Sequence, residues 1–176
     1  MGKNAGFVIR TATSADRAAI QEVTLAAYEQ YIQYMPPEAW DMYKADIIEK
    51  VANIGSRAEQ IVAESDGAIA GSVLIIPADS VVEVSDDESA RRRWPEIRLL
   101  AVAPSARGKG IGEALTRECI KRTREAGIPT VTLHTLDVMQ VAMRMYEKIG
   151  FVRMPELDYF PDPEFVVKGY RYDTEP

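Results

Sequence analysis

The chain has 176 residues, of which 47% are hydrophobic, and it carries 21 basic against 27 acidic side chains. This length and composition predict one globular domain, residues 1–176, with a sizeable buried core. The formal net charge of −6 argues against nucleic acid as a partner and mildly favours a cationic one. A single cysteine and a single histidine exclude an internal disulfide framework and the usual zinc spacings, so we expect no metal.

The sequence also bears on cellular location. No apolar run approaches the roughly 20 residues that a membrane span requires. The N-terminus, MGKNAGFVIR, lacks the apolar region of a signal peptide. With one cysteine, these features predict a cytoplasmic protein with no membrane partner. Whether the chain forms a homodimer is left open.

The first 60 residues predict a strand followed by two helices. The strand is expected at Phe7–Arg10, and the first helix follows a cap at Thr13 or Ser14. Pro36-Pro37 breaks that helix, and Pro37 opens a second one that stops near Gly55. Aromatic side chains gather around the break, and they either pack the two helices together or border a binding pocket. They are Tyr28, Tyr31, Tyr34 and Trp40.

A hairpin and a charged segment come next. Residues 60–64 and 68–76 are predicted to form the two strands of a hairpin, and Asp66-Gly67 supplies the turn. Residues 79–95 hold an acidic run followed by three arginines, which predicts a solvated loop or a short capped helix.

The chain is organised around the stretch Glu96 to Gly112, EIRLLAVAPSARGKGIG. Its apolar first half is typical of a strand covered on both faces, and Pro104 ends that strand. Glycines at alternate positions then precede a helical sequence, so backbone N–H groups at the helix start can meet an anion, with Arg107 and Lys109 adding positive charge. These residues predict a site for a phosphate-bearing ligand.

The remaining elements are expected at 111–126, 130–135, 138–149, 151–153 and 165–172, alternating helix and strand before a closing pair of strands. Cys119 falls on the buried face of the first of these helices and is interpreted as a core residue. His134, at the end of a strand, is interpreted as a satisfied structural histidine, with a catalytic role as the alternative. The connection 155–163 is either a rigid proline loop or a segment over the acceptor.

Two motifs resemble the GNAT superfamily of N-acyltransferases. The first is Leu100-Ala101-Val102-Ala103-Pro104 followed by Arg107-Gly108-Lys109-Gly110-Ile111-Gly112, which is similar to that family's acetyl-CoA signature. The second, VAMRMYEKIGF, carries Ala142, Met145, Tyr146, Gly150 and Phe151 at the family's spacing. Met139 departs from the pattern because many relatives carry Asn there, and Gln140 beside it is an open substitute.

The resemblance implies an α/β fold of α+β type, a GNAT-like acyl-CoA N-acyltransferase fold whose central mixed sheet is flanked by helices. It implies acetyl-CoA as co-substrate, bound by Leu100, Ala101, Val102, Ala142 and the six residues from Arg107 to Gly112. It also implies an acceptor site beside the first two helices. The candidates for that site are Tyr28, Tyr31, Trp40 and Tyr159.

Acetyl transfer to an amine needs a base, an oxyanion donor and an acid for the departing thiolate. Glu96 aligns with the glutamate that some relatives use as base. At about 3.3 Å per residue it lies roughly 13 Å along the strand from Leu100, so we expect a bridging water. The alternative is an exposed glutamate at a strand start. A backbone N–H near Leu100 to Val102 is the expected oxyanion donor, and Tyr146, whose phenol donates, is the expected acid. The alternative for Tyr146 is a tyrosine that packs its helix on the sheet.

The sequence therefore predicts an acetyl-CoA-dependent N-acetyltransferase that acts by direct transfer in a ternary complex, with a small-molecule primary amine as acceptor. Peptide or protein N-termini, a longer acyl chain or a hydroxyl acceptor remain open. The alternative from another class is a catalytically inactive acyl-CoA-binding or regulatory domain.

Overall fold

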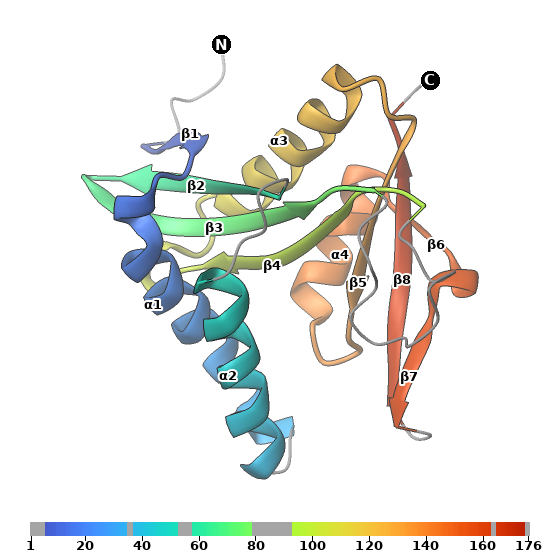
Figure 1. Ribbon diagram of the computed structural model, residues 1–176, viewed down its shortest axis with the longest axis horizontal. Helices are drawn as coiled ribbons and strands as arrows, with labels where there is room; N and C mark the ends of the chain where they lie inside the picture. The colour runs from blue at the N-terminus through green and yellow to red at the C-terminus, as the bar shows by residue number, and fades with distance from the viewer. Residues whose placement is uncertain (1–5, 35–36, 53–57, 79–92, 163–164, 175–176) are drawn as a thin grey trace. The chain divides into compact units, whose positions relative to one another are not determined.

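A computed structural model describes residues 6–34, 37–52, 58–78, 93–162 and 165–174 (Figure 1). Most of the charged segment predicted as a loop or short helix, residues 79–92, lies outside them. The strands are β1 (Val8–Thr11), β2 (Glu59–Ser65), β3 (Ala68–Ile76), β4 (Glu96–Val102), β5 (Thr130–Thr135), β6 (Val152–Arg153), β7 (Tyr159–Asp162) and β8 (Phe165–Asp173). The α-helices are α1 (Arg17–Tyr28), α2 (Pro37–Ala52), α3 (Ile111–Glu125) and α4 (Gln140–Ile149). Short 3₁₀ turns are η1 (Ser14–Asp16), η2 (Glu29–Tyr34), η3 (Pro104–Ala106) and η4 (Pro155–Leu157).

The strands form one mixed sheet in the order β1-β2-β3-β4-β5-β8-β6, with β7 paired to β8. The pairing of β4 with β5 is parallel, at Glu96 with Thr132 and at Ile97 with Leu133. The pairs of β1 with β2 and of β8 with β5, β6 and β7 are antiparallel. The predicted mixed sheet with flanking helices is therefore confirmed.

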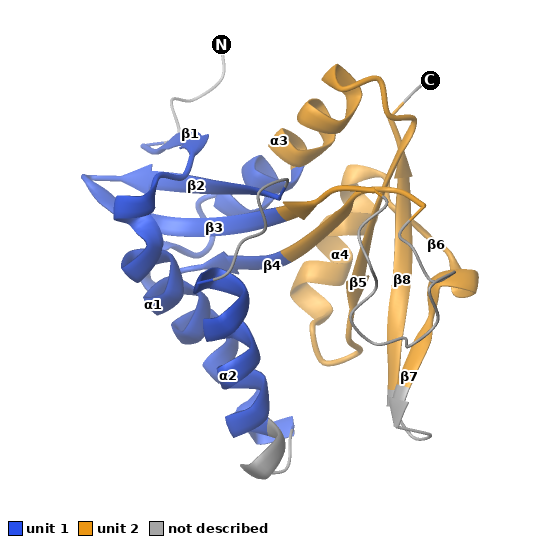
Figure 2. Cartoon of the chain, in the orientation of Figure 1, with its two compact units in different colours: residues 1–74, 99–116 blue, residues 75–98, 117–176 orange. Residues whose placement is uncertain are grey.

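The chain divides into two compact units, and the boundary passes through β3, β4 and α3 (Figure 2). Unit 1 holds residues 1–74 and 99–116, and unit 2 holds residues 75–98 and 117–176. The expectation of a single domain covering residues 1–176 stays a prediction.

Unit 1 is built on the β2–β3 hairpin and two neighbouring helices, α1 and α2 (Figure 1). The hairpin turns at Asp66 and Gly67, both with positive φ, as a two-residue turn that matches strand twist requires. Gly71 of β3 permits close packing, because a Cβ there would lie 2.9 Å from the Ala101 carbonyl and from a methyl of Ile111. The buried apolar core includes Ile20, Ile47, Val51, Ile61, Val62, Val73, Ala101, Ile111 and Leu115.

Unit 2 is built on β5 and β8, which pair along six residues from Thr130–Asp173 to Thr135–Lys168. Helix α4 ends at Gly150, whose φ of 118° lets its N–H reach the carbonyls of Tyr146 and Glu147. The buried apolar core includes Ile97, Cys119, Ile120, Val131, Leu133, Tyr146, Ile149, Phe151 and Tyr170.

Two predicted segments differ from the structure. The first helix does not run in α form to its proline break, because the chain tightens into the 3₁₀ turn η2 at Glu29. The predicted proline connection 155–163 contains η4 and the strand β7, since its residues find antiparallel partners on β8. Among the described residues, no helix is long and apolar enough to cross a membrane.

Candidate functional site

The turn between β4 and α3 has the backbone that the glycine motif predicts. Gly108 and Gly110 have φ of 76° and 80°, a region that side chains other than glycine rarely adopt. A Cβ at either position would meet no described atom within 4 Å, so the space above the turn is open. Gly112 follows in the first turn of α3, and Gly110 accepts the first helical hydrogen bond, from the Ala114 N–H, at 3.0 Å.

The electrostatics of this turn suit an anionic ligand. Arg107 and Lys109 are exposed on it, and Ile111, fully buried, anchors the start of α3. Free backbone N–H groups at a helix N-terminus carry partial positive charge, and the two cations add to it. One Arg107 nitrogen also donates to the carbonyl of Ala27 at 3.3 Å, which ties the turn to the end of α1.

Strand β4 contains a strained residue. Leu99 has φ of 50°, which is unusual for a residue with a branched side chain and costs about 1–3 kcal/mol. A positive φ inside a strand turns the backbone away from its regular extended path. It precedes Leu100, Ala101 and Val102, the segment predicted to offer a backbone N–H to the reacting group.

The aromatic residues predicted near an acceptor form a connected cluster in unit 1. The Tyr28 ring meets Tyr31 and Tyr43 edge-on, with centroids 6.0 and 5.8 Å apart, and Trp40 meets Tyr43 at 6.4 Å. Tyr28 is buried, so the interpretation as helix packing holds for it. Burial raises the pKa of the Tyr31 phenol, and the positive charge of Arg107 opposes that shift.

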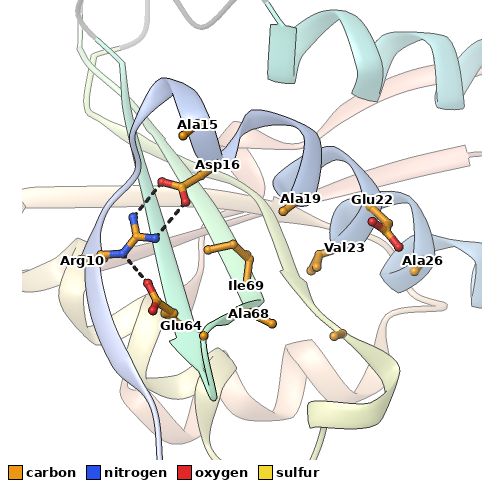
Figure 3. Close-up of a pocket in the computed structure, with 12 residues that line it drawn as sticks. Arg10, Ala15, Asp16, Ala19, Glu22, Val23, Ala26, Glu64, Ala68 and Ile69 are labelled. Carbon is orange, nitrogen blue, oxygen red and sulfur yellow. Dashed lines mark hydrogen bonds and ion pairs between the residues drawn. The ribbon is translucent and has the colours of Figure 1, made fainter.

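A pocket of about 460 Å³ also opens on unit 1, and it holds none of the predicted site residues (Figure 3). Arg10 dominates its polar edge, donating to both Asp16 oxygens at 2.7 and 2.8 Å and to Glu64 at 2.8 Å. The guanidinium of Arg10 holds the pKa of the Asp16 carboxyl well below its usual range. The apolar side chains of its wall come from η1, α1 and β3: Ala15, Ala19, Val23, Ala26, Ala68 and Ile69.

Glu96 lies in unit 2 and is only 6% exposed, so the alternative of an exposed glutamate at a strand start is wrong. Its Oε1 lies 2.9 Å from Nδ1 of His134 and 3.8 Å from Nε of Arg98. The start of β4 is anchored by Pro95, whose carbonyl accepts from the N–H and the hydroxyl of Thr132.

His134 is held at both ring nitrogens, since Nε2 lies 2.9 Å from the Leu157 carbonyl oxygen. The interpretation of a satisfied histidine is confirmed. Sequence reasoning missed that its partner is Glu96, 38 residues away. The sequence carries no signal for this contact, because it depends on the register of the parallel strands, in which Glu96 lies opposite Thr132, two residues before His134.

The two residues predicted on α4 differ in exposure. Tyr146 is buried and packs its ring edge-on against Phe151, with centroids 5.7 Å apart, while Ala142 is half-buried one turn earlier.

Cys119 is fully buried in α3, as predicted for a core residue. Within the described ranges no three His, Cys, Asp or Glu side chains gather as metal ligands.

Tyr159, the remaining acceptor candidate, lies on β7 with its ring edge-on to His134, centroids 5.3 Å apart. Beside it, Arg153 donates two hydrogen bonds to the Asp158 carboxylate, at 2.9 and 2.8 Å. This guanidinium is the main cause that lowers the pKa of the Asp158 carboxyl.

Comparison with known proteins defines the class. Residues 19–151 match the family model described as Acetyltransferase (GNAT) family. A mycothiol acetyltransferase from Sanguibacter keddieii is 35% identical over 119 residues, 66% of this chain and 36% of that protein, so the chain spans about a third of that curated relative. The chain therefore belongs to the GNAT acetyltransferase family.

Solved structures agree on the fold. A GNAT-family acetyltransferase from Staphylococcus aureus Mu50 superposes with a TM-score of 0.70 at 17% identity, covering 96% of this chain and 99% of that one. The PaiA N-acetyltransferase from Thermoplasma acidophilum, solved in complex with coenzyme A, gives a TM-score of 0.69 at 19% identity, covering 94% and 99%. At these identities the likeness establishes the GNAT fold.

Proposed function

We propose that this protein transfers the acetyl group of acetyl-CoA to a primary amine, by direct transfer in a ternary complex. The observation that carries the proposal is the turn from Arg107 to Gly112, in a chain of the GNAT family. Its positive-φ glycines, open space and two cations match what a pyrophosphate needs from a helix N-terminus. A single domain over residues 1–176 is part of the proposal.

We assign the binding of acetyl-CoA to the end of β4, the glycine turn and the start of α3. The six residues from Arg107 to Gly112 hold the pyrophosphate. The backbone of Leu100, Ala101 and Val102 pairs with the amide-rich pantetheine arm as an added strand would. One N–H of this segment faces the thioester oxygen as charge develops there, and the strain at Leu99 supports that role because it turns the backbone away from its extended path just before it. Ala142 supplies a small contact surface from α4.

The proton transfers are assigned to two buried side chains. Glu96 takes the proton of the attacking amine through a bridging water, and its burial supports this because the carboxylate is shielded from bulk water. Tyr146 donates its phenolic proton to the departing thiolate. Direct transfer is supported by the full burial of Cys119, which leaves this thiol out of reach of a thioester.

The acceptor is assigned as a small cationic amine, on the strength of the net charge of −6. Tyr28, Tyr31, Trp40 and Tyr159 are its proposed contacts. Location in the cytoplasm completes the proposal.

A first experiment measures release of free CoA from acetyl-CoA with a panel of small amines and N-terminal peptides. We expect turnover with at least one small amine, and a lower kcat for Tyr146→Phe. Tight CoA binding with no acetylation of any amine above background would instead assign the chain to the inactive acyl-CoA-binding class.

A second experiment tests the proposed pyrophosphate site at residues 107–112, called the cradle below, by calorimetric titration with CoA. Gly110→Asp adds side-chain strain and a negative charge at the turn, so we expect CoA binding to be abolished. Gly127→Asp is the matched control, because Gly127 ends the same helix with φ of 70° and equally open space. Equal affinity of both variants for CoA contradicts the assignment of the cradle.

A further inference from the structure

His134 is the only histidine of the chain, and both of its ring nitrogens have fixed partners. A carbonyl oxygen only accepts hydrogen bonds, so the 2.9 Å contact with the Leu157 carbonyl requires a proton on Nε2. The tautomer of the neutral ring is thereby set, and its unprotonated nitrogen, Nδ1, faces the carboxylate of Glu96.

This tautomer leaves one proton to be shared between Nδ1 and Glu96. Without a proton there, a nitrogen lone pair would face a carboxylate oxygen at 2.9 Å. With it, the contact is a hydrogen bond, whether the proton is bonded to the ring or to the carboxyl. Groups coupled in this way release their proton as a pair, so its loss cannot be ascribed to either residue alone.

The position of the Leu157 carbonyl is fixed by the strand opposite His134. His134 is registered with Gly169 of β8, and a Cβ at Gly169 would overlap Leu157 and approach the Met154 carbonyl to 3.0 Å. The absence of a side chain therefore lets the η4 turn lie against the strand. The Gly169 N–H also donates to Asp158 at 2.8 Å, immediately after Leu157.

Charged and titratable groups surround the pair on each neighbouring element. Arg98 of β4 approaches Glu96 to 3.8 Å and favours its ionised form. Asp158 interacts electrostatically with His134 but is itself held by Arg153 of β6. Lys168 of β8 is paired with Asp137, and the Tyr159 ring of β7 packs on the imidazole.

The geometry points to His134 as a positioning residue that decides when Glu96 can act as a base, an inference that rests on the proposed function of Glu96. While the pair holds its shared proton, the carboxylate is occupied. Once that proton has left to solvent, Glu96 and Nδ1 can accept one proton from the acceptor ammonium through the bridging water. The ammonium becomes a neutral amine, the pair regains one proton, and no electrons are exchanged.

A spectroscopic experiment tests the shared proton without relying on activity. In protein labelled with ¹⁵N-histidine, the single ring gives one pair of nitrogen signals that needs no assignment. We expect the Nε2–H tautomer in the neutral ring. In Glu96→Gln the side chain cannot take up a proton, so the pH midpoint of the ring should fall by at least one unit. The Nδ1–H tautomer, or an unchanged midpoint in Glu96→Gln, overturns the inference.

The kinetic consequence is tested by pH profiles of kcat/KM. His134→Asn places an amide N–H, which is not lost at ordinary pH, close to the position of Nδ1–H. The variant should therefore stay in the state with the occupied carboxylate, so kcat/KM should be low at every pH and its acidic fall should disappear. Lys168→Gln, which removes a nearby charge outside the proposed site, should leave the profile unchanged. An unmoved acidic limb in a folded His134→Asn variant overturns the role of His134. Absence of acetylation with every amine overturns the proposed function, while the nitrogen signals still report on the pair.

Discussion

The two units each contain a carboxylate cluster, and the two clusters differ in the kind of cation that they contain. In unit 1, Arg10 donates to Asp16 and Glu64 (Figure 3). In unit 2, Glu96 meets the imidazole of His134. A guanidinium keeps its protons at any ordinary pH, whereas an imidazole gains and loses one near neutrality.

Burial separates the two clusters further. In the first cluster the Arg10 and Glu64 side chains are 34% and 37% exposed and Asp16 is 12% exposed, whereas His134 and Glu96 are 20% and 8% exposed. Water and salt screen the first cluster, so it contributes modestly to folding. The second is shielded and contains a movable proton, which is the combination that acid–base chemistry requires. The four predictions below test this contrast, from the largest expected effect to the smallest.

The largest effect is expected from Glu96→Gln. Removing a general base lowers kcat/KM by about 10²–10⁴-fold. Affinity for CoA should not change, because the cradle is unaltered. Glu64→Gln is the matched control from the first cluster, and its kcat/KM should stay within about twofold of the original, as expected for a surface charge. Steady-state kinetics at saturating acetyl-CoA measures both. Similar losses of kcat/KM in the two variants would show that Glu96 contributes no more to catalysis than Glu64 does.

A smaller effect, on stability, is expected from Asp158→Asn. The carboxylate, 14% exposed, accepts two hydrogen bonds from Arg153 and one from the Gly169 N–H. Losing its charge should lower the free energy of unfolding by about 1–3 kcal/mol. Urea denaturation measures the change. Glu156→Gln, at an exposed position two residues earlier, should have almost no effect. If Glu156→Gln lowers the free energy of unfolding as much as Asp158→Asn, this segment is not stabilised through the Arg153 ion pair.

The pH dependence of stability follows from the same carboxylates. Hydrogen bonds from arginine lower the pKa of Asp16 and of Asp158 below the ordinary 3.8. A lowered pKa means that the folded state binds fewer protons, so both groups stabilise the fold above 3.8 and lose that contribution as the pH falls through their folded values. The free energy of unfolding should therefore decline on acidification from about pH 5. In Asp158→Asn the decline should be shallower, and an identical slope would contradict this account.

Much of the fold could be predicted from local patterns. The Asp66-Gly67 turn, the glycine turn after β4 and the strand from Thr130 to Thr135 follow from turn chemistry and periodicity, which act between near neighbours in sequence. The strand β7 was missed because its pairing depends on β8, a partner whose register is a tertiary property.

The candidate site also has one part that local sequence predicts and one part that depends on tertiary structure. The cradle residues are contiguous, so the motif alone indicated them. The partnership of Glu96 with His134 depends on the parallel pairing of β4 with β5 and on the missing side chain of Gly169, which admits the Leu157 carbonyl. Neither a 38-residue separation nor a single glycine in a strand signals this in sequence. The strain at Leu99 is likewise visible only in the backbone.

The smallest effect is expected from Asp16→Asn, in the Arg10 cluster. Asp16 accepts two hydrogen bonds from Arg10, but the guanidinium keeps Glu64 as a second carboxylate partner at 2.8 Å, so the loss should be about 1 kcal/mol or less. Asn can still accept from the Thr13 N–H, which Asp16 does at 2.7 Å, so the helix start is retained. Urea denaturation at low and high salt measures this variant beside Asp158→Asn. The loss for Asp16→Asn should be smaller and should shrink with salt, since exposed charges are screened. The two carboxylates are similarly exposed, 12% for Asp16 and 14% for Asp158, so a loss larger than that of Asp158→Asn would show that Glu64 does not compensate Arg10 for the loss of Asp16.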